Sequence, residues 1–144
     1  MASEIDIILA EFKNRLVGFT SLAVGADQLF AEAVLNCRGT LQAIIPFDGY
    51  ELKFARGADR EKYLQLLHQA ASVETLEKRE SDEAAYFAAG QKIVESAETI
   101  VAVWDGKPAA GLGGTGDVVA VALKKNKRII HINPDTQTVE QINF

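Results

Sequence analysis

A glycine-rich connection over residues 104–117 holds the groups of this sequence best suited to bind an anion. An apolar run over residues 100–103 precedes it and predicts a fully buried strand, and a helical pattern over residues 118–125 follows it. Glycine lets a backbone approach a ligand closely, and the N–H groups at the start of a helix point toward an anion. The residues expected to bind phosphate here are Gly113, Gly114 and Thr115, with Thr115 also predicted as the helix N-cap. The alternative is a connection that binds nothing, and the loop matches neither GxGxxG nor the Walker A pattern.

A second junction of the same kind, with small residues between a strand and a helix, covers residues 20–27. Ser21 is a candidate phosphate ligand, and capping of the next helix is its alternative role. Asp27 is a candidate acceptor for a ribose hydroxyl, and capping is again the alternative. Gly25 supplies the small residue that the turn needs. This junction is a weaker signal than the first.

Acidic and aromatic residues follow the predicted strands and complete the candidate site. Asp105 is either a general base or sugar anchor, or a turn residue before a glycine. Asp117 lies in the first turn of its predicted helix, where a negative charge is favoured by the helix dipole whether or not the residue takes part in catalysis. Trp104 either stacks on a base or packs as a half-buried core residue. Pro46 ends a strand because it cannot donate to a sheet ladder, and Tyr50, in the irregular stretch that follows, either covers a pocket or pins a surface loop.

Length and composition predict one globular domain, residues 1–144, with a formal net charge of −5 and a pI near 5.0. This charge disfavours nucleic acid as a partner, because nucleic-acid binding normally needs a basic face. No apolar run reaches the roughly 20 residues of a membrane span, and the first residues lack the basic segment of a secretory signal. Cys37 is the only cysteine, which favours a cytoplasmic protein, and His68 and His131 fit no metal-ligand spacing. We therefore expect no metal, no cofactor and no membrane contact.

Helical and strand patterns alternate along the chain. Helical patterns cover residues 5–12, 27–35, 60–70, 81–96 and 118–125, and strand patterns cover residues 16–19, 41–46, 72–76, 100–103 and 128–132. This order predicts an α/β fold, a single Rossmann-like three-layer domain with a mostly parallel sheet and helices on both faces. The tail from residue 136 is expected to add an edge strand. Ligands of such sheets bind beyond the carboxyl ends of the strands, so residues 20–27, 46–50 and 105–117 are expected to line one crevice.

Two finer expectations concern the helices. In the second helical pattern, the side chains expected to face inward are those of Leu29, Phe30, Ala33 and Val34. In the third, Asp59 is expected to cap the first turn.

The segments TSLAVGADQLF, from residue 20, and VWDGKPAAGLGGTGDVV, from residue 103, resemble the SLOG superfamily, and the resemblance extends over residues 16–134. This superfamily contains Rossmann-like domains related to the LONELY GUY phosphoribohydrolases and to DNA-processing protein A. Its members bind nucleotides or nucleotide-derived signals, and some cleave an N-glycosidic bond. The resemblance implies a nucleotide site at the Gly113–Thr115 loop, with Ser21 and Gly25 opposite.

The chain departs from the pattern of that superfamily at two points. LONELY GUY enzymes carry a PGGxGTxxE motif whose glutamate serves catalysis, whereas this loop lacks the proline and has Asp117 as a shorter substitute. Similar domains also begin with a strand and a Gly-His-Arg-like loop, whereas this sequence begins at the first helix. The usual first strand is therefore expected to be missing, or its place to be filled by a partner chain. Both departures weaken the case for catalysis more than the case for binding.

Three functions fit these residues. The first is a cytoplasmic sensor domain that binds a nucleotide or nucleotide sugar, with phosphate on residues 113–115 and ribose on Asp27 or Asp105. The second is an enzyme that cleaves or transfers the N-glycosidic bond of a nucleoside or its monophosphate. Its carboxylates are Asp105 and Asp117, in an Asp-Gly…Gly-Thr pattern that also resembles nucleoside deoxyribosyltransferases. The third is an assembly subunit with a vestigial pocket. A homodimer or higher homo-oligomer is expected in each case.

Overall fold

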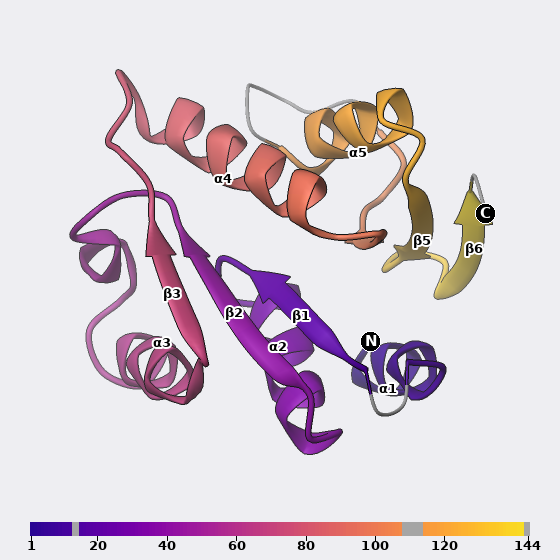
Figure 1. Cartoon of the computed structure of the whole chain (residues 1–144), viewed down its shortest axis with the longest axis horizontal. Helices are drawn as coiled ribbons and strands as arrows, with labels where there is room; N and C mark the ends of the chain where they lie inside the picture. The colour runs from indigo at the N-terminus through magenta and orange to yellow at the C-terminus, as the bar shows by residue number, and fades with distance from the viewer. Residues whose placement is uncertain (13–14, 108–113, 143–144) are drawn as a thin grey trace. The chain divides into compact units, whose positions relative to one another are not determined.

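The computed structural model of the chain, shown in Figure 1, describes residues 1–12, 15–107 and 114–142. Its helices are α1 (Ala2–Ala10), α2 (Ala26–Asn36), the short 3₁₀-helix η1 (Tyr50–Lys53), α3 (Ala58–Gln69), α4 (Asp82–Ser96) and α5 (Thr115–Lys124). Its strands are β1 (Val17–Thr20), β2 (Thr40–Ile45), β3 (Ser72–Thr75), β4 (Thr99–Val103), β5 (Arg128–Asn133) and β6 (Thr138–Ile142). Helices and strands alternate from α1 to β5, so the predicted α/β class is confirmed. None of the helices in these residues combines the length and apolar content needed to span a bilayer.

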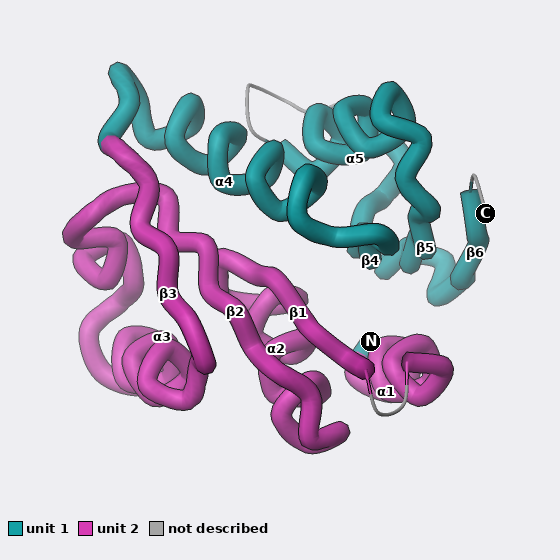
Figure 2. The backbone as a smooth tube through the Cα atoms, viewed as in Figure 1, with its two compact units in different colours: residues 1, 78–144 teal, residues 2–77 magenta. Residues whose placement is uncertain are grey.

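The chain divides into two compact units, which Figure 2 shows in different colours. Unit 2 contains residues 2–77, and unit 1 contains residues 78–144 together with Met1. The strands hydrogen-bond in two sets of three, β1-β2-β3 and β4-β5-β6, so each unit has a sheet of its own.

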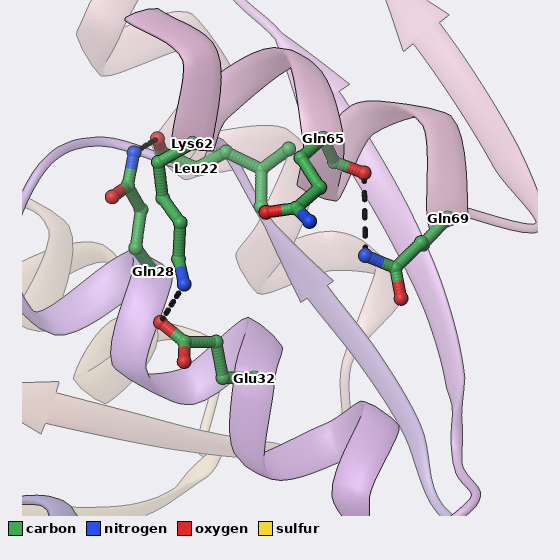
Figure 3. Close-up of polar contacts among 6 residues, drawn as sticks. All are labelled: Leu22, Gln28, Glu32, Lys62, Gln65 and Gln69. Atoms are coloured by element: carbon green, nitrogen blue, oxygen red, sulfur yellow. Dashed lines mark hydrogen bonds and ion pairs between the residues drawn. The ribbon is translucent and has the colours of Figure 1, made fainter. Parts of the chain in front are cut away.

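Unit 2 is built on an all-parallel sheet, in which Thr20 pairs with Ala43 and Ile45 pairs with Thr75. Helix α2 packs on β1 and β2 and contacts both α1 and α3. A Cβ atom at Gly18 of β1 would lie 2.7 Å from Cγ2 of Val34, so glycine lets α2 approach the strand this closely. The ion pair between Lys62 Nζ and Glu32 Oε1, at 3.0 Å, joins α3 to α2 (Figure 3).

Unit 1 is built on the parallel pair β4–β5, to which β6 adds an antiparallel strand. The strand expected from the tail is therefore confirmed. Helices α4 and α5 pack on each other and supply part of a core whose buried members are Val94, Ile100, Ala102, Val119, Ala122 and Ile129. A Cβ atom at Gly90 of α4 would lie 2.6 Å from Cγ2 of Val118, so the two helices meet at this glycine.

Two of the predicted helix caps are wrong. Gly114 is the N-cap of α5, and Thr115 is its first helical residue. Gly57 is the N-cap of α3, and Asp59 lies inside the first turn. Gly57 has φ 92° and ψ −132°, a conformation that only glycine adopts at low cost, so the backbone of this glycine decides where α3 begins.

Burial differs from the prediction at α2 and at β4. The buried side chains of α2 are Gln28, Ala31, Ala33 and Val34, whereas Leu29 and Phe30, expected to be inward, are partly exposed. Gln28 is turned inward because its side chain hydrogen-bonds to the preceding loop. Along β4, burial alternates instead of being complete, and only Ile100 and Ala102 are buried.

Candidate functional site

Two of the segments predicted to contact a ligand lie at one edge of the unit 2 sheet. The β1–α2 loop, residues 21–25, follows the carboxyl end of β1, and Pro46 directly follows the carboxyl end of β2. Because β1 and β2 are parallel neighbours, these ends meet at the same edge of the sheet. Pro46 itself is fully buried, so at this edge the β1–α2 loop carries the accessible candidates.

The β1–α2 loop has an unusual backbone that its own side chains hold in place. Leu22 has φ 62°, in the left-handed region, although it is not glycine and its side chain is fully buried. The N–H of Leu22 donates to Thr20 Oγ1 at 3.1 Å. The carbonyl of Leu22 accepts from Gln28 Nε2 at 3.2 Å, as Figure 3 shows. Such a conformation costs on the order of 1–3 kcal/mol and persists only when its surroundings enforce it.

Asp27 bonds to the same loop from the first turn of α2. Its Oδ2 accepts a hydrogen bond from the N–H of Ala23 at 3.2 Å. Burial raises the pKa of Asp27 above its usual range, and the nearby N–H of Ala23, side chain of Thr20 and backbone of Ser21, which favour the charged carboxylate, oppose that rise. The structure thus gives Asp27 a loop-organising contact that neither expectation, ribose acceptor or cap, included.

The start of α2 has backbone donors that no side chain caps. Gly25 is the N-cap, with φ 103° and ψ −127°, and it offers no side-chain hydrogen bond. The first N–H groups of a helix have no partner within the helix. A Cβ atom at Gly25 would meet open space, so this glycine serves the backbone conformation. The hydroxyl of Ser21, partly exposed beside this turn, makes no hydrogen bond to the residues that the structure describes.

The aromatic residues after β2 form a buried cluster. Tyr50 is 6% exposed and packs edge-to-face against Phe47, Phe54 and Tyr63, with ring centroids 5.8, 5.1 and 5.5 Å away. Phe54 stacks on Tyr63 at 4.4 Å. Burial, and to a smaller extent the charge of Glu51, raises the pKa of Tyr63 to about 12. Tyr50 therefore belongs to the core of unit 2, because its ring contacts other rings, and these contacts fit the alternative in which Tyr50 pins its loop.

In unit 1, Trp104 fixes the backbone at the carboxyl end of β4. Its N–H donates to the carbonyl of Ile132 at 2.9 Å, and its indole Nε1 donates to the carbonyl of Lys107 at 2.8 Å. The carbonyl of Trp104 accepts from His131 Nε2 at 2.7 Å, and the two rings lie 5.1 Å apart. Trp104 is half-buried against the unit 1 core, which matches the packing alternative for this residue.

The two acidic candidates of unit 1 have different surroundings. Asp105 is exposed, and its Oδ1 accepts from the N–H of Lys107 at 2.9 Å, as expected of a turn residue before a glycine. Asp117 lies in the first turn of α5, where its N–H donates to the carbonyl of Gly114 at 3.1 Å. Gly114 offers no side-chain cap to the helix. Gly113, the first residue of the predicted phosphate loop, lies outside the described residues.

The candidates thus fall into two groups. Ser21, Gly25, Asp27, Pro46 and Tyr50 belong to unit 2, and Trp104, Asp105, Gly114, Thr115 and Asp117 belong to unit 1. A single crevice lined by both groups stays a prediction. Gln28 and Thr20, which hold the β1–α2 loop, were missed by the sequence analysis. The signal for Gln28 was a polar side chain on the face of α2 that packs on the sheet.

Within residues 1–12, 15–107 and 114–142, no group of three or more histidine, cysteine, aspartate or glutamate side chains is arranged to hold a metal ion. No model of a known protein family matches this chain, and no curated protein matches its sequence.

Proposed function

We propose that this chain binds a nucleotide or nucleotide derivative through its phosphate groups, in the manner of SLOG domains. One observation carries the proposal. Helix α2 begins without a side-chain cap, directly after a loop whose polar side chains bond to the loop itself.

Those internal bonds decide what the loop offers to a ligand. Thr20, Asp27 and Gln28 are all engaged with the loop backbone. The groups left to contact a ligand are the first N–H groups of α2 and the hydroxyl of Ser21. This is a set of hydrogen-bond donors at the positive end of a helix dipole, which favours an anion with several acceptor oxygens. Phosphate has this chemistry.

Helix α5, like α2, begins without a side-chain cap. Its N-cap is Gly114, without a side-chain cap, whereas the N-cap of α4 is Ser81, whose Oγ accepts from the N–H of Ala84 at 3.1 Å. The loop that ends at Gly114 and Thr115 is therefore the second phosphate position that we propose. The resemblance of both junctions to SLOG domains supports a nucleotide as the source of the phosphate.

A thermal-shift screen tests the proposal. The purified chain is heated with nucleoside mono-, di- and triphosphates, ADP-ribose and cyclic nucleotides. A ligand at about 100 times its dissociation constant adds about 2.7 kcal/mol to the free energy of unfolding, which is a readable shift. A well-folded protein that responds to none of these compounds contradicts the proposal.

A matched pair of serine variants connects binding to the β1–α2 loop. Ser21→Ala removes one hydroxyl that we expect to touch the phosphate, and a hydrogen bond to a charged group contributes about 1.5–3 kcal/mol. We therefore expect the dissociation constant to rise at least tenfold. Ser72→Ala, at the exposed amino end of β3 in the same unit, is expected to leave binding unchanged. Equal affinities in the two variants would remove Ser21 from the site.

Product analysis separates a sensor from an enzyme. The chain is incubated with a nucleoside monophosphate that binds, and release of the free base is measured. Binding without base release supports the sensor. Base release that is lost in Asp117→Asn, with the fold intact, would instead indicate cleavage of the N-glycosidic bond.

A further inference from the structure

We propose that His131 is a proton-responsive clasp of the unit 1 sheet: when its ring takes up a second proton, it attracts Glu140 of β6 and keeps its bond to Trp104 at the end of β4. The clasp lies within unit 1 and does not depend on the proposed function. It makes the cohesion of this sheet respond to acidification.

The contact with Trp104 fixes which ring nitrogen of His131 carries the proton. His131 Nε2 lies 2.7 Å from the carbonyl oxygen of Trp104. A carbonyl oxygen only accepts hydrogen bonds, so Nε2 is the donor, and in the neutral ring Nδ1 is an acceptor without a proton. Nδ1 makes no hydrogen bond to the residues that the structure describes. The second proton therefore binds at Nδ1, and the bond to Trp104 is kept.

Glu140 is the charged residue that the sheet places directly opposite His131. The two residues are cross-strand partners of the antiparallel strands β5 and β6, so their side chains share one face of the sheet. Glu140 is exposed, and its carboxylate makes no hydrogen bond or ion pair with the described part of the chain. The carboxylate can therefore turn toward a cation on β5, and opposite charges at such a position hold two strands together.

The other charged groups around His131 are placed differently. Strand β5 packs against β4, β6 and α5, and β4 itself has no titratable side chain. Arg128, three positions from His131, points to the opposite face of the sheet and donates to Gln141 Oε1 at 3.0 Å. None of the remaining groups is a sheet partner of His131, which pairs with Ala102 and Glu140. These remaining groups, on α5 and in the turns after β4 and β5, are Asp117, Lys124, Asp105, Lys107 and Asp135.

Protonation strengthens the contacts on both sides of His131. On the β4 side, the hydrogen bond to the Trp104 carbonyl becomes charge-assisted, which makes it roughly twice as strong as a neutral one. The centroids of the His131 and Trp104 rings are 5.1 Å apart, within the range of a cation–π attraction. On the β6 side, the new charge meets the carboxylate of Glu140.

Fluorescence reads the charge of His131 selectively. Trp104 is the only tryptophan of the chain, and His68 is the only other histidine. An imidazolium ring beside an indole quenches its emission. We expect the emission of the wild type to fall in one step as the pH is lowered from 8 to 5, the interval in which histidine changes charge. His131→Gln should abolish the step, and a step that persists in this variant overturns the proposal.

His68→Gln is the matched control for that variant. His68 is exposed in α3 of unit 2, so the same chemical change there should leave the step in place. A step that disappears in His68→Gln would assign the proton to the wrong histidine and overturn the proposal.

Glu140→Gln tests the partner on β6. Loss of the anion disfavours the charged ring, so the step should move to lower pH. Asp135→Asn removes an equally exposed carboxylate from the turn between β5 and β6, and it should leave the step where it is. An unchanged step in Glu140→Gln overturns the pairing. So do equal movements in both variants, because they would reflect net charge alone.

NMR of the wild type keeps the test valid if His131→Gln does not fold. The ¹⁵N shifts of the His131 ring should show a proton on Nε2 near pH 8 and its second proton on Nδ1 near pH 5. A proton on Nδ1 near pH 8 overturns the proposal. Amide exchange of residues 138–142, compared between wild type and His131→Gln, should show more protection in the wild type near pH 5 than near pH 8. The same ratio at both pH values would mean that the sheet does not respond to the proton.

Discussion

Asp27 and Asp59 occupy the same position in two helices that begin with the same three residues, but only Asp27 bonds to the loop before its helix. Its Oδ2 lies 3.2 Å from the backbone nitrogen of Ala23. The side chain of Asp59 is exposed and makes no hydrogen bond to the described residues. Identical local sequence therefore produces a loop-holding residue in one place and a solvated carboxylate in the other. The difference comes from the segment that precedes each helix. The segment before α2 leaves the end of strand β1, whereas the segment before α3 is an irregular stretch after η1.

The first prediction concerns the pH dependence of stability at Asp27. Burial raises the pKa of Asp27 in the folded chain above its unfolded value of about 3.9. The folded state therefore holds this proton more tightly than the unfolded state does. The stabilising contribution is fully present below about pH 3.9 and is lost as the pH rises through the folded-state pKa. Relative to Asp27→Asn, the wild type should gain free energy of unfolding as the pH is lowered from 7 toward 4.

Urea denaturation at several pH values measures this difference. Asp59→Asn is taken through the same series, and the difference between the two variants isolates the contribution of the buried carboxyl. If the free energy of unfolding of the wild type increased relative to that of Asp27→Asn as the pH rose, the raised pKa of Asp27 would be contradicted.

The second prediction concerns the buried side chain of Leu22. It is fully buried, so Leu22→Ala should lower the free energy of unfolding by about 2–5 kcal/mol. Leu52 in η1 is 69% exposed, and Leu52→Ala should change stability by no more than about 0.5 kcal/mol. Urea denaturation of both variants is the measurement. Similar losses in the two would mean that the burial of Leu22 does not hold the loop.

The third prediction is a reversal of sign at the α4–α5 contact. Alanine is favoured over glycine inside a helix by about 1 kcal/mol. At Gly90, however, the added Cβ would lie 2.6 Å from Cγ2 of Val118, and overpacking costs about 1–3 kcal/mol. Gly90→Ala should therefore destabilise the wild type. In a Val118→Ala background the obstructing methyl groups are gone, and the same substitution should stabilise the chain by about 1 kcal/mol.

A double-mutant cycle measured by urea denaturation tests this reversal. The effect of Gly90→Ala is compared in the two backgrounds. The same sign in both would show that α4 and α5 do not pack at this glycine.

The fourth prediction concerns the indole of Trp104. Trp104→Phe keeps an aromatic ring but removes the Nε1–H that donates to the carbonyl of Lys107. The cost should be about 1 kcal/mol, the net contribution of an ordinary hydrogen bond. Hydrogen exchange should quicken at the amide of Lys107, as the turn loosens, and stay slow at the amide of residue 104, which still donates to Ile132. Faster exchange at both amides would indicate that the end of β4 has opened.

The sequence predicted the elements well, because each pattern has a local cause. Alternating helical and strand patterns predicted the α/β class, and five strands were located within about one residue of β1 to β5. The helical pattern over residues 81–96 located the start of α4 within one residue, and Ser81 is the N-cap of this helix. Prediction from the sequence was less reliable where two local signals competed. At α3 and α5 it favoured a polar cap, but a glycine is the N-cap of each helix. Gly57, with φ 92°, adopts a conformation that glycine favours, whereas Gly114 has an extended backbone with φ −72° and ψ 167°.

The sequence by itself also determined which junctions carry small and polar residues at strand ends, and so where the candidate site residues lie along the chain. Only the tertiary structure decided what each side chain does there. Asp27 bonds to its own loop, Tyr50 is buried among other aromatic rings, and Asp105 forms a turn. The physical reason is that a helix or strand depends on residues a few positions apart. The burial and hydrogen bonding of a side chain depend instead on groups that the fold brings together, as in the contact of Tyr50 with Tyr63.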